Sequence, residues 1–128
     1  MRLGAFGWIL AFAIATVPQA LLAGNLSVSL RNFYAEYEIV VQCQKHDQVS
    51  AADVERAKAA IEKIETYYLA KDSKIDKARL LKQAAADRDE GFKIVTRSAK
   101  TDLRPYCRMS LNELLTKGEE IDPSGKGQ

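Results

Sequence analysis

The segment 50–71, SAADVERAKAAIEKIETYYLAK, decides the fold of this 128-residue chain. Its apolar residues recur at alternating spacings of three and four, as Val54, Ala57, Ile61, Ile64 and Tyr68. This spacing places them on one face of an α-helix and is typical of the seam of a helical bundle. Ser50 followed by Asp53 predicts a capping box at the first turn. The segment therefore predicts a bundle helix that lasts to about residue 71.

Three further helices are predicted around this segment from the same kind of spacing. The first covers 27–45, the next begins at Ser73 and continues through Gly91, and a shorter one covers 101–118. The stripe of the helix after Ser73 is predicted to comprise Ala78, Leu81, Ala85, Phe92 and Val95. The predicted fold class is all-α, an up-down helical bundle of three long helices plus a shorter fourth.

The N-terminus has the order of a secretory signal peptide. Arg2 precedes an apolar run over 3–17, and small residues follow at Ala20 and Ala23. We expect cleavage after Ala23, with Ala20 as the alternative. The predicted organisation is a signal peptide over 1–23, a helical bundle domain over 24–118 and a disordered polar tail over 119–128.

A retained membrane anchor is the alternative interpretation of the N-terminus. The apolar run is nearly as long as the roughly 20 residues that a transmembrane helix needs. Both topologies place the folded part outside the cytosol, so the expected location is periplasmic or secreted. With signal cleavage, no stable membrane insertion is expected.

The two cysteines, Cys43 and Cys107, are predicted to form a disulfide bond. An oxidising compartment favours this pairing over free thiols or a metal site. In an up-down bundle the first helix ends at the pole where the fourth begins, so both cysteines fall at one level. The disulfide is therefore expected to staple the bundle.

The charge balance argues against two classes of partner. Removing Arg2 from the 19 basic residues leaves 18 against 17 acidic ones, and the two signs are interspersed along the chain. A nucleic-acid binder would show a basic face, and so would a protein that binds membranes electrostatically. We therefore expect no nucleic-acid partner.

His46, the only histidine, is the first candidate for chemistry. It could act as a general base beside Asp47, but a residue just after a helix end also suits exposure near the negative pole of the helix dipole. A haem held by His46 and Met109 would be crowded by the predicted disulfide. Neither idea singles out a catalytic or cofactor-binding residue.

The acidic residues Asp87, Asp89 and Glu90 are the part of the sequence that most resembles a metal site. Arg88 interrupts it, and the twelve-residue pattern of a calcium loop does not continue from it. The sequence therefore predicts no metal, no cofactor and no catalytic set, so the protein is expected not to be an enzyme.

Three tyrosines lie off the predicted stripes: Tyr34, Tyr67 and Tyr106. Tyrosines exposed on a helical surface are frequent in protein interfaces, so these three are the predicted partner surface. Together with the missing catalytic set, they favour a non-enzymatic protein-binding module, such as an adaptor, an inhibitor or an immunity-type factor. Its protein partner and oligomeric state are unknown.

A periplasmic stress chaperone is the second hypothesis. The expected protein is similar in size and architecture to small acid-stress chaperones of the HdeA type, which also carry one disulfide between two cysteines. In acid, 17 carboxylates would lose their charge while the basic groups remain, and the resulting repulsion could loosen the bundle. An enzyme with no recognisable centre is the third hypothesis.

Overall fold

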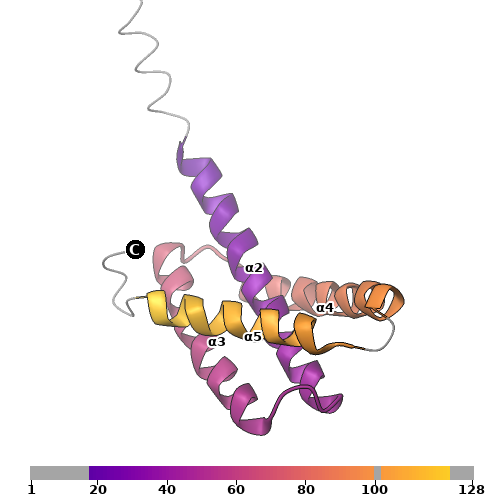
Figure 1. The fold of residues 1–128 in the computed structure, drawn as a ribbon. Coiled ribbons are helices and arrows are strands. Elements are labelled where there is room, and N and C mark those ends of the chain that lie inside the picture. The colour runs from indigo at the N-terminus through magenta and orange to yellow at the C-terminus, as the bar shows by residue number, and fades with distance from the viewer. Residues whose placement is uncertain (1–17, 100–101, 122–128) are drawn as a thin grey trace, which may run out of the picture.

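The computed structural model describes residues 18–99 and 102–121. These residues form four helices, which are α2 (Pro18–Lys45), α3 (Ala51–Lys71), α4 (Lys77–Ala99) and α5 (Arg104–Glu120). Short loops connect them, and the described part contains no strand (Figure 1). The prediction of an all-α, up-down helical bundle is confirmed.

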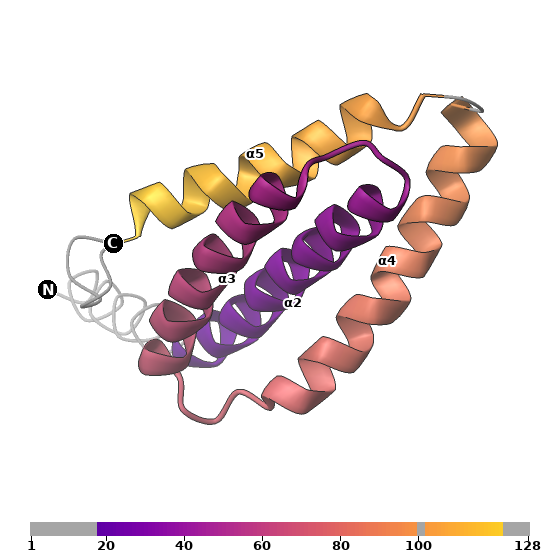
Figure 2. The same cartoon turned by 90° about the horizontal axis from the view of Figure 1, so that it is seen from below.

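Helix α2 is the centre of the bundle. It contacts α3, α4 and α5, whereas α3 packs on α2 and α5, and α4 packs chiefly on α2. Seen from below, α2 lies between α3 and α4, and α5 covers the side nearer to α3 (Figure 2). The side chains of α2 are therefore covered from several directions.

The core is built from aliphatic side chains of α2, α3 and α5. Its largest fully buried members are Leu30, Val40, Ile64, Leu111 and Leu114. Removing such side chains from water is the main favourable contribution to folding. The stripe predicted for α3 is confirmed, because Ala57, Ile61, Ile64 and Tyr68 are buried and Val54 packs against the core.

The disulfide between Cys43 and Cys107 is present, as predicted. It joins the last turn of α2 to the first turn of α5, with a Cα–Cα distance of 6.0 Å. Both cysteines are fully buried. Because the bond closes a separation of 64 residues, it holds the end of α2 and the start of α5 together at one pole of the bundle.

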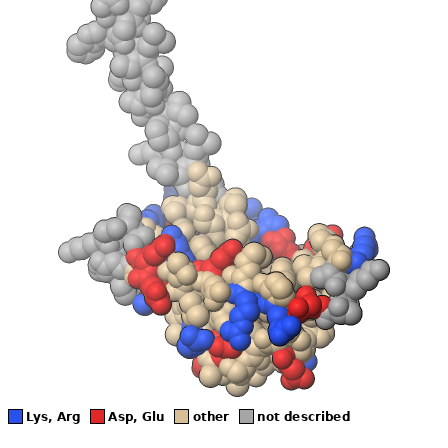
Figure 3. Space-filling model, viewed as in Figure 1, with Lys and Arg blue, Asp and Glu red and all other residues tan. Residues whose placement is uncertain are grey.

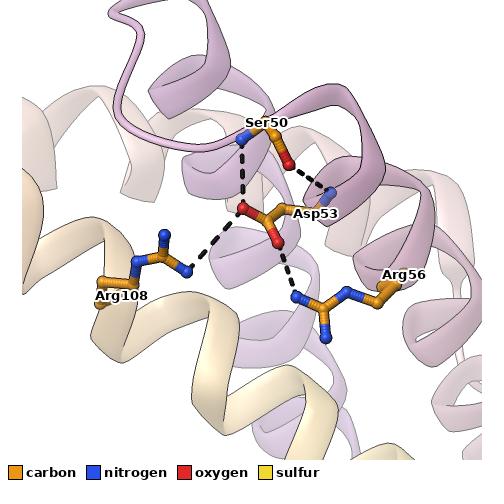
Figure 4. Close-up of polar contacts among 4 residues, drawn as sticks. All are labelled: Ser50, Asp53, Arg56 and Arg108. Carbon is orange, nitrogen blue, oxygen red and sulfur yellow. Dashed lines mark hydrogen bonds and ion pairs between the residues drawn. The ribbon is translucent and has the colours of Figure 1, made fainter.

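The predicted capping box at the start of α3 is also present (Figure 4). The Ser50 Oγ accepts a hydrogen bond from the Asp53 amide at 3.1 Å, and the Asp53 carboxylate accepts one from the Ser50 amide at 3.1 Å. Asp53 also pairs with Arg56 at 2.6 Å and lies 3.8 Å from Arg108 of α5. The cap therefore links α3 to α5. Hydrogen bonds from Arg56 and Ser50 hold the pKa of Asp53 below its usual value.

Helix α4 begins later than predicted. It starts at Lys77, and its cap is Asp76, whose carboxylate accepts a hydrogen bond from the Arg79 amide at 3.1 Å. Ser73 instead lies in the preceding loop. The helix runs without interruption through Gly91, as predicted.

The predicted stripe of α4 is wrong in its first half. Leu81 is 37 % exposed and Ala78 is exposed, whereas Leu80 and Ala84 are buried. The reason is that α4 turns a different set of residues inward: Leu80 and Ala84 enter the core, and Asp87, three residues later, pairs with Arg31 of α2. The charged residue Asp87 is paired across the interface between α4 and α2. The spacing of apolar residues alone does not reveal such a pair.

The ends of the domain also differ from the boundaries predicted from the sequence. Helix α2 begins at Pro18 instead of residue 27, so the cleavage positions predicted after Ala20 and Ala23 lie within helical residues. The rest of the predicted signal peptide, 1–17, lies outside the described residues.

At the other end, the predicted disordered tail starts too early. Helix α5 lasts to Glu120, and Ile121 is only 3 % exposed because it packs into the core. The remainder of that predicted tail, 122–128, lies outside the described residues. Within the described ranges, no helix has both the length and the apolar character that crossing a bilayer requires.

Candidate binding groove between α2 and α5

A groove of about 490 Å³ lies between α2 and α5. Its wall contains one aromatic side chain, four neutral polar side chains and four ionisable ones. They are Phe33; Ser29, Asn32, Asn112 and Thr116; and Glu36, Glu113, Lys117 and Glu120. The groove thus combines an apolar surface with several hydrogen-bonding groups, which is the usual make-up of a binding site.

Glu36 enters the groove because of its place on α2. It follows Phe33 by three residues and precedes Val40 by four, so it lies on the face of the helix that packs against the core. Glu113 lies one residue before the buried Leu114 of α5. Because α2 and α5 pack together, these two positions bring the carboxyl groups of Glu36 and Glu113 next to each other.

The environment of Glu36 favours its neutral form. Burial raises the pKa of Glu36 to about 9, and the neighbouring Glu113 carboxylate adds to this rise. The Oε2 atom of Glu36 is buried and accepts no hydrogen bond from a described donor, so its one hydrogen-bonding neighbour among the described residues is the carboxyl group of Glu113. At neutral pH Glu36 is therefore a neutral carboxylic acid, because burial and the adjacent carboxyl group of Glu113 both disfavour its charged form.

Tyr106 is a further titratable group that faces Glu36. Burial raises the pKa of the Tyr106 phenol, and the charge of an ionised Glu36 would raise it further. Its ring packs edge-on against Phe92 of α4, with a centroid distance of 5.6 Å. Tyr106 therefore connects the start of α5 to α4, and it is only partly buried.

The prediction that Tyr34 and Tyr67 are exposed is wrong. Tyr34 is 3 % exposed and Tyr67 is 7 % exposed. The Tyr34 hydroxyl donates a hydrogen bond of 2.5 Å to Glu65 of α3, and Tyr67 packs edge-on against Tyr68. Tyr34 lies off the apolar stripe of α2, but it is still buried because α2 packs against other helices on several sides. The role of the three tyrosines in binding a partner stays a prediction, but their burial argues against a common exposed patch.

Helix α4 is attached by three ion pairs that cross between helices. Arg31 of α2 binds Asp87 through two hydrogen bonds of 2.7 and 2.8 Å, and Glu38 of α2 accepts one from Arg88 at 3.3 Å. Lys77 lies 3.1 Å from Glu65 of α3. The hydrogen bonds from Arg31 hold the pKa of Asp87 below its usual value. Each of these links contains a carboxylate.

The remaining sequence candidates lie away from the groove. His46 is exposed, and its ring stacks on Phe92 at 5.9 Å. It is ten positions after Glu36, which corresponds to about 15 Å along a helix. Met109 is exposed.

Two of the three acidic residues on α4 form ion pairs with arginines. Asp87 is bound by Arg31, and Asp89 lies 2.9 Å from Arg88. Over the described residues, no three metal-ligating side chains come together.

Comparison with known proteins gives no relative. The chain matches no family model, no curated protein and no solved structure. A functional proposal for this chain therefore rests on the chemistry of the groove itself.

Sequence reasoning missed Glu36 and Glu113, although a signal for Glu36 was present. Phe33, Glu36, Val40 and Cys43 recur at spacings of three, four and three, so Glu36 occupies a core-facing position in a helix that is otherwise apolar there. A lone acidic residue on such a stripe indicates either a buried partner or a site. Its neighbour Glu113 could be found only from the packing of α5 on α2.

Proposed function

We propose that this protein is a non-enzymatic helical module that binds a protein partner outside the cytosol, as an adaptor, an inhibitor or an immunity-type factor. The groove between α2 and α5 is its contact surface. The observation that carries this proposal is the buried Oε2 atom of Glu36, which accepts no hydrogen bond from a described donor. Buried polar atoms in folded proteins are nearly always paired, so a group supplied by a partner would complete the site.

The walls of the groove support a preformed site. The Cys43–Cys107 bond ties α2 to α5, and Leu111 and Leu114 of α5 are buried in the core. Neither helix can move far without breaking this packing. A preformed site loses little conformational entropy on binding, which favours affinity.

The composition of the wall suits a polypeptide. Phe33 offers an apolar contact, and the amides of Asn32 and Asn112 can both donate and accept hydrogen bonds. On the face that α5 crosses, acidic and basic side chains are interspersed instead of forming one large field (Figure 3). A protein of mixed charge is therefore a better match than a nucleic acid.

The expected location rests on the disulfide and on the predicted signal peptide. Disulfides persist in oxidising compartments, which include the periplasm and the extracellular space. A buried structural disulfide is therefore compatible with an extracytoplasmic protein.

Site-specific photo-crosslinking in the producing cells tests this function. A photoreactive phenylalanine analogue replaces Asn112, an exposed residue of the groove, and in a second variant Lys82, an exposed residue of α4. We expect one dominant protein, captured at near-equal stoichiometry from position 112 and not from position 82. Equal capture from both positions, or none from position 112, would contradict the groove as the contact surface.

The attachment of α4 favours a second candidate function, an acid-stress chaperone. The three links described for α4 all need an ionised carboxylate, and of the described side chains of this helix only Leu80 and Ala84 belong to the buried core. Protonation in strong acid would weaken these links and uncover apolar side chains of α2. The released surface could then hold unfolded proteins.

A dye that fluoresces on apolar surfaces tests the chaperone function. Because the pKa of Asp87 is lowered from 3.8, its ion pair is intact above that value and is lost as the pH falls further. We expect dye binding to rise only in this acidic range. If fluorescence stays flat down to the pH of global unfolding, α4 is not released and the chaperone function is excluded.

A further inference from the structure

We propose that the groove between α2 and α5 receives the ammonium group of a lysine side chain of the partner, and that this group binds Glu36 and Glu113 in place of the proton of Glu36. The proposal rests on the proposed function, because it names the chemical group by which a protein partner would be recognised.

The first argument is the unmet hydrogen-bonding capacity of Glu36. Its Oε2 atom is buried in a groove that is wide enough to admit a side chain, and it accepts no hydrogen bond from a described donor. The hydrogen bond between Glu36 and Glu113 exists only while a carboxyl proton is present. An ammonium group has three donors and no acceptor. It can therefore reach Glu36, Glu113 and one neutral acceptor of the wall, such as Asn32 or Asn112, at the same time.

The second argument is charge. Once Glu36 is ionised, the groove contains three acidic side chains and one basic one, Lys117. The titratable groups that face Glu36 itself are Glu113 and Tyr106, both from α5. Neither of these two groups is a cation, so a cation from a partner would relieve their repulsion.

The third argument is shape. Phe33 provides an apolar wall that suits the four-carbon stem of lysine, while the charged end reaches the carboxyl groups. Two carboxyl groups provide only part of the six to eight oxygen ligands of a calcium ion. An ammonium, which needs three acceptors, fits this set better.

Proton balance gives the proposal a distinctive signature. The lysine enters as an ammonium and keeps its protons, while Glu36 releases one proton to the buffer. Below the pKa of Glu36, which is about 9, each rise of one pH unit should therefore strengthen binding about tenfold. A site that binds lysine without releasing a proton would show no such dependence.

A pair of short peptides provides the test. The processed protein, purified from the compartment where it accumulates, is titrated with acetyl-Gly-Lys-Gly-amide and with the same peptide carrying norleucine in place of lysine. NMR chemical shifts report where binding occurs, and repeating the titration at several pH values reports the linked proton.

The supporting result has three parts. The lysine peptide shifts the signals of groove residues, the norleucine peptide does not, and the Kd falls about tenfold per pH unit. Glu36→Gln and Glu113→Gln should each weaken binding at least about tenfold, which is what losing one close charge pair costs. Glu119→Gln, which removes an exposed charge of the same helix outside the groove, should leave the Kd unchanged.

Other outcomes overturn the proposal and separate it from the proposed function. Equal binding of both peptides, or a Kd that does not change with pH, would each exclude recognition by a proton-displacing ammonium. If neither peptide binds although position 112 still captures a partner, the lysine proposal fails and the binding module stands. If position 112 captures nothing either, both fail.

Discussion

The hydroxyl group of Tyr106 lies directly against the backbone of Gly91. A Cβ atom placed on Gly91 would overlap the Tyr106 hydroxyl oxygen, while the ring carbon behind it would remain at ordinary contact distance. Gly91 therefore allows α4 to approach the start of α5 in the middle of an otherwise regular helix. This contact explains why a glycine, which is a poor helix former, occupies this position of α4.

The contact predicts that Gly91→Ala lowers the free energy of unfolding, although alanine is the better helix former by about 1 kcal/mol. In a Tyr106→Phe background the obstructing oxygen is absent, so the same alanine should instead stabilise the protein by up to about 1 kcal/mol. Chemical denaturation of the wild type, the two single variants and the double variant measures how much the effect of Gly91→Ala depends on Tyr106. An equal effect of alanine in both backgrounds would contradict the contact.

Glu36 predicts a specific pH dependence of stability. The folded protein keeps the Glu36 proton up to about pH 9, whereas the unfolded chain releases it near 4.5. Between these values the folded state binds more protons, so this residue makes the free energy of unfolding fall as the pH rises. Glu36→Gln cannot release a proton, and its stability relative to the wild type should increase steadily across the same range.

The matched control for this prediction is Glu119→Gln, which changes the same charge at an exposed position of α5. Its stability difference from the wild type should vary little over that pH range. A Glu36→Gln variant that behaves like this control would show that Glu36 is ionised in the folded protein at neutral pH.

The disulfide predicts a large loss of stability on removal. Replacing Cys43 and Cys107 by serine together should lower the free energy of unfolding by about 4 kcal/mol, because the bond closes a loop over 64 residues. The loss should be measured by urea denaturation of oxidised wild type against the double variant. Both sulfurs are buried, so mild reductant should act only as the protein unfolds. Rapid reduction of the folded protein would contradict this burial.

The capping box predicts a smaller and local effect. Ser50→Ala removes the hydroxyl oxygen that accepts the Asp53 amide, and we expect a loss of about 1 kcal/mol. Hydrogen exchange should accelerate first in the opening turn of α3. Ser73→Ala is the control, because the structure places Ser73 in a loop and not at a helix cap, so a similar loss there would be unexpected.

The sequence by itself determined the helices of the bundle and the disulfide bond that joins two of them. Apolar residues at spacings of three and four define α3, because a helix that must bury one face repeats its apolar side chains every turn. Ser50 and Asp53 marked the start of α3, because capping is a local interaction between residues three apart. The pairing of Cys43 with Cys107 followed from topology, because alternating helices bring these two ends to one pole.

Tertiary structure alone decided which neighbour each polar side chain meets. Tyr34 is buried because α2 is covered from several sides, and Asp87 occupies an inward position because Arg31 of another helix pairs with it. The groove exists for the same reason, since only the packing of α5 on α2 places Glu113 beside Glu36. Helical periodicity records which face of a helix is apolar, but the axial register between two helices depends on contacts between residues far apart in the chain.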